Sequence, residues 1–553
     1  IAFVISVWAM VWRGLHWRAS GPETPDVARV PEGKENDAEA PAVRHPRHKQ
    51  ALVSNRSTHM RKRRTLSGEE RNYVHQMMQA SQWLLLAACS SILLVVVTNQ
   101  ITLDVAPIPL LWVLPLGLYL VSYVISFSLP KPSLTRSLIP LFSISTLAIV
   151  YALSQGNRIS IPAQLLIHNS ALFIACLVAH GELARLRPEP YLLTAFYLIT
   201  ALGGVLGTVL VNLAAPLIFT HYWEYHLGFL FCWALLVAVL YLDPASILHK
   251  ARKYLVLYVL LIPPVTLLLF TLQYLRTFNT TTVLSTRNFY GTLRLQERSN
   301  LAGWESLYVL SHGTTIHGMQ FKDSELRKDP IAYFNPGSGI GRLLTGLNQD
   351  PQPRKVGILG LGVGTLAAYG REQDLYRFYE INPDVVTLAE GMEGYFTYLA
   401  NSPADIDVVL GDARLSLEIE LTAGSRQNYD VLVLDVFSGD AVPVHLLTEE
   451  CFDVYLDHLA PEGVIAAQAS TTHVNIIPLL SRVAQTKGLY AIVIEDAAAD
   501  YICCPSRWVL MSRSMRNLSS SSVAEVSRPI DQPIARVRLW TDNYSNPLQV
   551  LYR

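Results

Sequence analysis

Long apolar runs dominate the first half of the chain, between residues 83 and 275. Crossing a bilayer core of about 30 Å takes about 20 apolar residues per helix, and seven runs approach or exceed that length. They lie near residues 83–100, 108–129, 138–155, 161–180, 191–217, 227–242 and 254–275. This pattern predicts a multi-pass membrane domain of about seven α-helices over residues 81–276.

Two further segments precede this membrane domain. Residues 1–18 are expected to be the tail of a truncated membrane helix, because residues 1–12 are apolar and the chain begins with Ile1 rather than Met. Residues 19–80 are rich in proline and charge and show little periodicity, so they are expected to form a polar, flexible linker. The basic run at 61–64 belongs to this linker.

A different pattern follows the last apolar run. Apolar and polar residues alternate through residues 285–322, with turn signals between the alternating segments, as in a small antiparallel sheet. We place this β segment at 284–335. His312 and His317 lie five positions apart within it, with no Asp or Cys to complete a metal site, and are interpreted as structural.

Residues 336–553 alternate short apolar strands with helix-like stretches, which predicts an α/β domain with a parallel sheet. The first strand ends in a turn that contains Gly360, Gly362 and Gly364, and such a turn lets a ligand approach the backbone closely. The second strand ends in Glu380, about 20 residues further on, where an acid can accept hydrogen bonds from ribose hydroxyls. The motif therefore predicts an adenosine-type ligand.

The next two strands add polar residues to the same edge of the sheet. The third strand ends in Asp412 and Ala413, and the fourth ends in Asp435. In methyltransferase-like domains the acid after the third strand faces the adenine amino group, and the acid after the fourth faces the reacting centre. The predicted fold is thus a multi-pass α-helical membrane domain, a small β-rich segment and an α/β methyltransferase-like (Rossmann-type) domain.

Composition narrows the function further. The chain has 553 residues, more than one core usually holds, and 51% of them are hydrophobic. Its formal net charge is zero, so no nucleic-acid partner is expected. The six cysteines form no C-x-x-C motif and no Cys/His cluster, so neither a metal site nor a disulfide framework is expected.

Basic residues between the apolar runs bear on orientation, because they favour the cytoplasmic side of a membrane. They are Arg13, Arg18, the run 61–64, Lys131, Arg136, Arg185, Arg187, Lys250, Arg252 and Lys253. Their alternation fits a multi-pass protein of the cell (inner) membrane. Seven spans from a cytoplasmic linker would place the α/β domain outside, whereas a nucleoside-using enzyme is expected in the cytoplasm. The sequence leaves both orientations open.

Several motifs together resemble the spermidine synthase (polyamine aminopropyltransferase) family, and more closely its membrane-fused bacterial branch. They are FYGTLRL, HGTTIHGMQ, GLGVGT, YEINPDV, GDAR, LDVFSGDAVP and LWTDNYSNPL, and the resemblance extends from about residue 80 to 550. It implies transfer of an aminopropyl group from decarboxylated S-adenosylmethionine, the co-substrate, to an amine such as putrescine, and methylthioadenosine leaves. The resemblance implies no metal and no tightly bound cofactor. The apolar runs imply a lipid bilayer around the helices, and a homo-oligomer stays open.

The resemblance also assigns roles to individual residues. The implied co-substrate contacts are Gln320 near the sulfonium tail, the glycine turn of Gly360, Gly362 and Gly364, Glu380 at the ribose, and Asp412 with Ala413 at the adenine. The implied catalytic residues are Tyr333 and Asp435, the second of which accepts the proton of the attacking amine.

Two positions depart from the family pattern. The glycine turn usually carries an aspartate that helps to hold the amine of the donor, and this chain has Val363 there. A second aspartate usually follows the catalytic one by three residues, and this chain has Ser438, with Asp440 nearby. Because a buried ammonium needs an anionic partner, two alternatives stay open: an S-adenosylmethionine-dependent methyltransferase, and a transporter or sensor that binds a nucleoside or polyamine without turnover.

Overall fold

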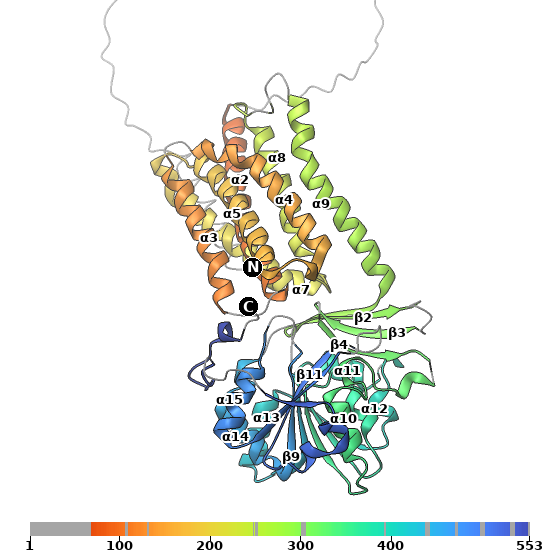
Figure 1. Cartoon of the computed structure of the whole chain (residues 1–553). Helices are drawn as coiled ribbons and strands as arrows, with labels where there is room; N and C mark the ends of the chain where they lie inside the picture. The colour runs from red at the N-terminus through yellow and green to blue at the C-terminus, as the bar shows by residue number, and fades with distance from the viewer. Residues whose placement is uncertain are drawn as a thin grey trace, which may run out of the picture.

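The structure, a computed structural model, describes residues 68–550 except 105–108, 130–131, 247, 249–252, 300–305, 314, 324, 392–393, 437–442, 471–473, 498–503 and 531–536. A layer of long helices lies at one end, a small sheet lies in the middle, and an α/β domain lies at the other end (Figure 1). The predicted fold class is therefore confirmed. The predicted helix tail at residues 1–18 lies outside the described residues.

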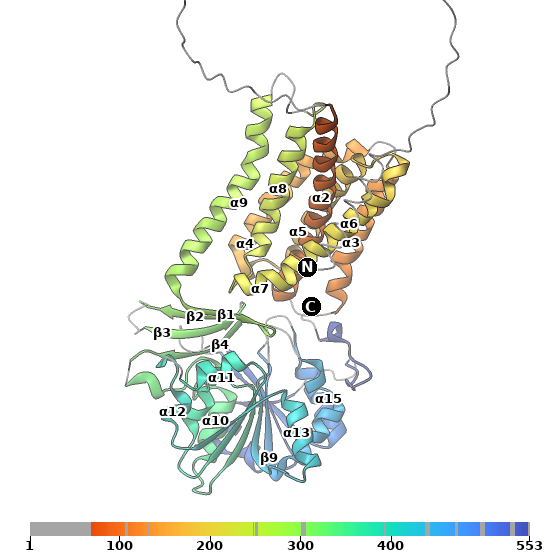
Figure 2. The same cartoon turned by 180° about the vertical axis from the view of Figure 1, so that it is seen from behind.

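Over the residues that the structure describes, each of the seven predicted apolar runs coincides with a helix or a helical stretch. The helical elements are α2 (Gly68–Asp104), α3 (Pro109–Ser128), α4 (Ile139–Gln155), α5 (Ile161–Arg185), α6 (Leu193–Val209), the π-helix η4 (Leu210–Ala214), α7 (Ala215–Ile218), α8 (Glu224–Leu242) and α9 (Lys253–Thr281). In the described part of the chain, six helices are long and apolar enough to cross a membrane, and α3 contributes a shorter apolar stretch. Figure 2 shows these helices side by side from behind.

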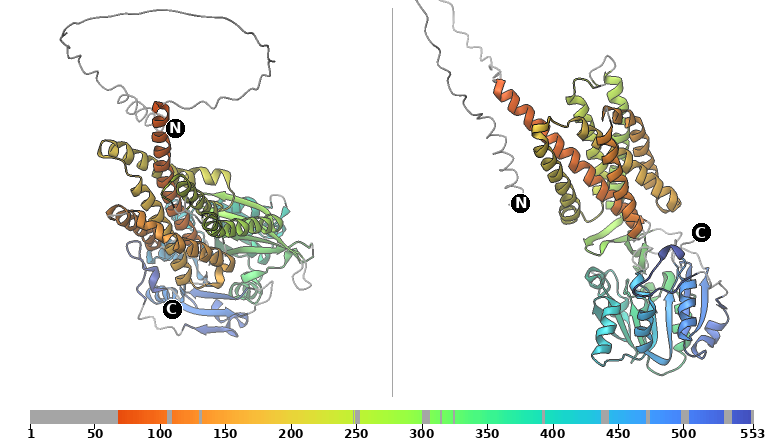
Figure 3. Two further views of the ribbon diagram at one scale, coloured as in Figure 1. Left: turned by 90° about the horizontal axis from the view of Figure 1, so that it is seen from above. Right: turned by 90° about the vertical axis from the view of Figure 1, so that its left-hand side faces the viewer.

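The start of α2 corrects one expected boundary. The helix begins at Gly68, so residues 68–80, which the sequence reading assigned to the flexible linker, are helical. Their composition is polar, and hydropathy alone does not distinguish a linker from a helix that extends beyond the apolar run. Figure 3 shows α2 running the length of the helical layer.

Different contacts hold the two ends of the helical layer. At the end far from the α/β domain, Trp83 Nε1 donates to the carbonyl of Leu186 at 3.0 Å. Arg136 and Arg185 both pair with Asp243 there, at 2.8 and 3.3 Å. The first half of α2, the end of α5 and the end of α8 therefore meet at this outer end.

The inner end contacts the small sheet. Helix α9 continues directly into β1, and Ser285 Oγ donates to the carbonyl of Thr220 at 3.0 Å. Arg287 on β1 pairs with Glu224, the first residue of α8, at 2.7 Å. Because both side chains of this pair are buried, the ion pair fixes the sheet to the helical layer.

The small sheet is antiparallel, as its alternating pattern predicted. Its strands are β1 (Thr282–Asn288), β2 (Gly291–Arg298), β3 (Leu307–His312) and β4 (Thr315–Phe321), paired in sequence order. Buried residues of β2 and β3 pack on the core of the α/β domain, so this sheet lies between the helical layer and the larger sheet (Figure 1).

The larger sheet has eight strands in the order β12-β10-β11-β9-β8-β5-β6-β7. The parallel part comprises β5 (Lys355–Leu359), β6 (Leu375–Glu380), β7 (Asp405–Leu410), β8 (Tyr429–Leu434) and β9 (Leu459–Gln468). The antiparallel part comprises β10 (Tyr490–Asp496), β11 (Ser506–Ser512) and β12 (Ser527–Pro529). The chain moves outward from β5 through β6 to β7 and then returns to β8, so the strand order reverses between β5 and β8. Ligands of such sheets bind at the carboxyl ends of the strands at this reversal.

Helices cover both faces of the larger sheet. The first face carries α10 (Gly339–Leu347) and α11 (Pro383–Ala389), and the other carries α13 (Ala413–Thr422), α14 (Glu449–Asp457) and α15 (Ile477–Lys487) (Figures 1 and 2). The strands themselves are buried on both faces, which explains their continuous apolar sequences.

Candidate functional site

The candidate site lies on the edge of the larger sheet that faces the small sheet. Asn288, at the end of β1, donates from Nδ2 to Asn382 Oδ1 at 2.7 Å, and Asn382 follows the carboxyl end of β6. The carboxyl ends of β5, β6, β7 and β8 therefore point toward the small sheet and the helical layer. We refer to this edge as the catalytic rim.

The three glycines after β5 adopt backbone conformations that other residues avoid. Their φ angles are +92° at Gly360, +54° at Gly362 and +79° at Gly364. A Cβ on Gly362 would lie 2.6 Å from the carbonyl oxygen of His317 on β4. The five-residue 3₁₀ turn Thr365–Tyr369 follows, in place of a long helix. Glycine is therefore required in this turn for two reasons: the positive φ angles, and the close approach of β4 to Gly362.

Glu380 lies beside this turn and already accepts two backbone hydrogen bonds. Leu361 N donates to Oε2 at 3.0 Å, and Asn382 N donates to Oε1 at 2.8 Å. Burial raises the pKa of Glu380, and the backbone donors oppose that shift. Each carboxylate oxygen keeps further lone pairs, so this geometry can also accept ribose hydroxyls.

Tyr333 and Asp435 meet although they are far apart in the sequence. Tyr333 donates from its hydroxyl to Asp435 Oδ2 at 3.5 Å, a long contact of the kind that tightens when substrate binds. Burial raises the pKa of Asp435 to about 7, the Tyr333 hydrogen bond lowers it, and the charge of Glu380 raises it. A carboxylate that titrates near neutral pH suits the proton acceptor of an amine.

Local structure holds this pair in place. Tyr333 lies in the short 3₁₀ turn Ala332–Phe334, where Ala332 has φ of +60°. Trp508 Nε1 donates to the Tyr333 carbonyl at 3.4 Å. Asp435 N donates to the carbonyl of Leu359 at 2.9 Å, which fixes the residue beside the end of β5. The turn, Glu380 and the Tyr333–Asp435 pair are therefore neighbours on the catalytic rim.

Asp412 caps the helix that follows β7. Its Oδ1 accepts a hydrogen bond from Leu415 N at 2.9 Å, and its Oδ2 lies 3.0 Å from His445 Nε2. The contact with His445 lowers the pKa of Asp412. Ala413 is the first residue of α13 and is buried. An adenine contact would therefore have to share Asp412 with His445, a partially exposed residue that the sequence reading did not single out.

Gln320 is completely buried, and its amide is held by protein groups. Nε2 donates to the carbonyl of Arg327 at 2.7 Å and to Thr397 Oγ1 at 3.1 Å, while Oε1 accepts from Thr397 N at 2.8 Å. The side chain thus ties β4 to the segments before α10 and α12 (Tyr398–Asn401). Contact with a co-substrate would require one of these hydrogen bonds to be shared or broken.

Val363, which replaces the expected aspartate, is buried in the glycine turn. A Cβ on Gly318 of β4 would collide with its side chain, so valine and glycine pack closely where the family carries a charge. Ser438 and Asp440 lie outside the described residues. Among described residues, no group of three or more His, Cys, Asp or Glu side chains could hold a metal ion.

One further acid near the rim was missed by the sequence reading. Asp496 ends β10, and its Oδ2 accepts a hydrogen bond from Asn335 Nδ2 at 3.1 Å. Asn335 follows the turn that carries Tyr333, so Asp496 lies close to the Tyr333–Asp435 pair. Its signal in the sequence was the same as that of Asp435, an acid at the end of an apolar strand.

Comparison with known proteins supports the family resemblance over part of the chain. No protein-family model matches. The polyamine aminopropyltransferase of Vibrio vulnificus (strain CMCP6) is 31% identical over 169 residues, which is 30% of this chain and 52% of that protein. The probable polyamine aminopropyl transferase of Bifidobacterium longum (strain NCC 2705) is 31% identical over 108 residues, which is 20% of this chain and 22% of that protein.

Among solved structures, a probable spermidine synthase from Corynebacterium glutamicum ATCC 13032 is similar with a TM-score of 0.34 and 16% identity, over 44% of this chain and 84% of that one. The chain spans about half or less of the length of the curated relatives it matches. These relatives confirm the resemblance to the spermidine synthase (polyamine aminopropyltransferase) family, and their names refer to no membrane part.

Proposed function

We propose that the protein is a membrane-tethered aminopropyltransferase. The observation that carries the proposal is the Tyr333–Asp435 pair beside the glycine turn and Glu380, in a chain whose curated relatives are named polyamine aminopropyltransferases. The donor is decarboxylated S-adenosylmethionine and the acceptor is an amine such as putrescine. The apolar helices α2 to α9 provide the tether.

The chemistry follows from these positions. The nitrogen lone pair of the acceptor attacks the carbon next to the sulfonium, the carbon–sulfur bond breaks, and methylthioadenosine leaves with the bonding electrons. The nitrogen then loses a proton, which Asp435 accepts. Glu380 and the glycine turn hold the nucleoside, so that much of the rate enhancement comes from orientation. Tyr333 keeps the Asp435 carboxylate pointed toward the acceptor.

The test is aminopropyl transfer by the purified full chain and by Asp435→Asn. We expect the variant to lose activity by about 10²–10⁴-fold, because general-base catalysis contributes about that much, and to retain affinity for methylthioadenosine. Asp457→Asn, the same change at an exposed acid at the end of α14, serves as the control. Turnover by Asp435→Asn at the wild-type rate would exclude Asp435 as the proton acceptor.

Val363 motivates a second candidate function. The residue is buried where the family holds the amine of the donor with a carboxylate, and methyl transfer from intact S-adenosylmethionine does not depend on that carboxylate. Calorimetry on the full chain with decarboxylated S-adenosylmethionine, S-adenosylmethionine and methylthioadenosine separates the two candidates. Tighter binding of intact S-adenosylmethionine would favour a methyltransferase, and binding of nucleosides without turnover would favour a sensor or transporter.

A further inference from the structure

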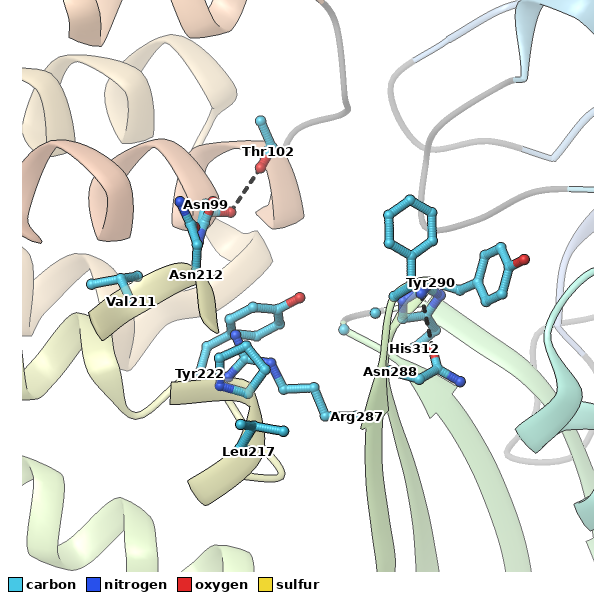
Figure 4. A pocket seen from close by; sticks show the side chains of 14 residues that line it. Asn99, Thr102, Val211, Asn212, Leu217, Tyr222, Arg287, Asn288, Tyr290 and His312 are labelled. Carbon is cyan, nitrogen blue, oxygen red and sulfur yellow. Dashed lines mark hydrogen bonds between the residues drawn. The ribbon is translucent and has the colours of Figure 1, made fainter. Parts of the chain in front are cut away.

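A cavity of about 640 Å³ lies between the inner end of the helical layer and the small sheet (Figure 4). Its volume falls within the range of about 300–1,000 Å³ that is typical of small-molecule sites. Helical residues line one side and residues of the β1–β2 and β3–β4 turns line the other (Figure 4). The polar lining residues used below are Asn99, Asn212, Tyr222, Asn288, Tyr290 and His312.

Among the lining residues that the structure describes, Arg287 is the only charged side chain, and it is already paired. It donates to Glu224 through Nη2 to Oε1 at 2.7 Å and Nη1 to Oε2 at 3.2 Å. The guanidinium also lies over the ring of Tyr222, 4.3 Å from its centroid. A charged ligand would lose its hydration without gaining a counter-ion, so the lining favours an uncharged ligand.

Apart from Arg287, the lining includes several aromatic and amide side chains. Phe289 is 95% exposed in the β1–β2 turn, and Tyr290 follows it, so the sheet side contributes two aromatic residues to the lining. Asn99 and Asn212 bring amide groups from the helical side (Figure 4). Flat rings opposite hydrogen-bonding amides suit a planar molecule with a polar edge, which is the chemistry of a nucleoside.

The helical wall carries an irregularity at this place. Asn212 and Val211 belong to the π-helix η4, which interrupts the apolar stretch between α6 and α7. Single π-turns within α-helices occur frequently at functional sites, because the irregular turn moves side chains out of the regular helical register. Here the irregular turn lies at the cavity rather than in the middle of the helical layer.

Hydrogen bonds connect the cavity with the catalytic rim. Asn288 lines the cavity and donates to Asn382 Oδ1 at 2.7 Å, and Asn382 N donates to Glu380 Oε1 at 2.8 Å. The rings of His312, which also lines the cavity, and His317 lie 5.6 Å apart, and the carbonyl of His317 lies against Gly362. The cavity is therefore connected to Glu380 and the glycine turn through neighbouring residues, but neither Glu380 nor the turn lines it.

We propose that this cavity is a second binding site, for an uncharged nucleoside. The specific choice of methylthioadenosine rests on the proposed function, since that reaction releases it at the catalytic rim, whereas the preference for an uncharged nucleoside rests on the lining alone. The site receives the product between the rim and the helical layer.

The test is equilibrium binding of radiolabelled methylthioadenosine to the full chain in nanodiscs. We expect two sites per chain. Asn212→Leu and Phe289→Ser should each weaken binding at the cavity site by about tenfold or more, the scale of a lost base–aromatic contact. Matched controls are Leu213→Ala, which changes a neighbour in the same π-helix that does not line the cavity, and Val283→Ser on β1. Glu380→Ala is expected to weaken only the other site.

The outcomes separate the two proposals. A single site that Glu380→Ala weakens and that Asn212→Leu and Phe289→Ser leave unchanged would overturn the cavity assignment and leave the proposed function standing. A single site that follows the opposite pattern would support the cavity and count against the proposed function. Displacement of methylthioadenosine from the Asn212-dependent site by putrescine or by phospholipid at lower concentrations than by adenosine would overturn the ligand class.

Discussion

Asp435 places a carboxylate where burial disfavours its charge, and its two neighbours act on it in opposite directions. The hydroxyl of Tyr333 stabilises the charged form, whereas the charge of Glu380 destabilises it. Burial is the largest of these influences and brings the pKa to about 7. Small changes in this environment should therefore appear directly in the dependence of activity on pH.

The pKa of Asp435 predicts how kcat/KM depends on pH. Asp435 must be deprotonated to accept a proton, so activity should rise as pH increases through about 7. Tyr333→Phe removes the hydrogen bond that lowers the pKa of Asp435, so the rising limb should move to higher pH. If the rising limb of kcat/KM lies at the same pH in Tyr333→Phe as in the wild type, the long Tyr333–Asp435 contact does not change the pKa of the carboxylate. Both proteins must be folded over the pH range of the measurement.

Glu380→Ala should weaken nucleoside binding by about tenfold or more, because hydrogen bonds to a charged group contribute about 1.5–3 kcal/mol. Glu390→Ala, which removes an exposed acid at the end of α11, the helix that follows Glu380, is the matched control. Calorimetry with methylthioadenosine measures the difference. Equal affinities for the two variants would place the ribose elsewhere.

Gly362→Ala tests the glycine turn against a matched glycine. Gly362 and Gly424 both have positive φ, +54° and +76°, but a Cβ on Gly424 would meet nothing within 4 Å. Gly424→Ala should lower the free energy of unfolding by about 1–2 kcal/mol through its φ alone. Gly362→Ala should lower it further, because its Cβ also meets the His317 carbonyl. Thermal or denaturant unfolding of both variants gives the comparison.

At the scale of elements, the terminal motif LWTDNYSNPL acts as a clasp on the helices that surround Asp412. Asp542 receives two hydrogen bonds from Arg414 at 2.7 Å each and one from Thr448 Oγ1 at 2.8 Å. Arg414 also donates to the carbonyl of His445 at 3.0 Å. A segment far along the chain thereby orders the residue that contacts Asp412.

The Asp542 clasp should weaken in acid. Its contacts lower the pKa of Asp542 from 3.8 to about 2, so the folded state binds fewer protons than the unfolded state between these values. The contribution to stability is therefore complete above pH 4 and disappears as the pH falls toward 2. In Asp542→Asn this part of the pH dependence should be absent. Urea unfolding of both proteins between pH 2 and 6 measures it, and parallel curves would contradict the prediction.

In the whole molecule, ion pairs identify the two ends of the helical layer. Arg136 and Arg185 lie at the outer end, where α2 begins, and the α/β domain lies at the inner end, where α9 finishes. Helix α8 connects these ends, because it begins beside Arg287 and finishes beside Asp243. The start of α2 and the α/β domain are therefore on opposite sides of the layer.

Orientation in the membrane follows from this arrangement as a prediction. Because basic residues favour the cytoplasm, we expect the outer end to be cytoplasmic and the α/β domain to lie on the opposite side. Alkaline phosphatase fused after Arg553 should then be active, and green fluorescent protein fused there should be dark. The opposite result would place the α/β domain in the cytoplasm, with its nucleoside donor, and would require the basic residues to face outward.

Local periodicity and length were enough to predict the apolar helices, the antiparallel lead-in and the positions of the parallel strands along the chain. The sequence pattern also placed Glu380 and Asp435 on one edge, since the carboxyl ends of parallel strands share an edge. It set the helix boundary too late, because residues 68–80 are polar yet helical.

The partners of each polar side chain depend on the tertiary structure. It joined Tyr333 to Asp435 across 102 positions, enclosed the Gln320 amide in protein hydrogen bonds, and brought His445 to Asp412. It also formed the cavity between the helical layer and the small sheet. Periodicity fixes the direction of a side chain relative to its own element, whereas contacts between distant segments depend on how those elements pack, which no local pattern encodes.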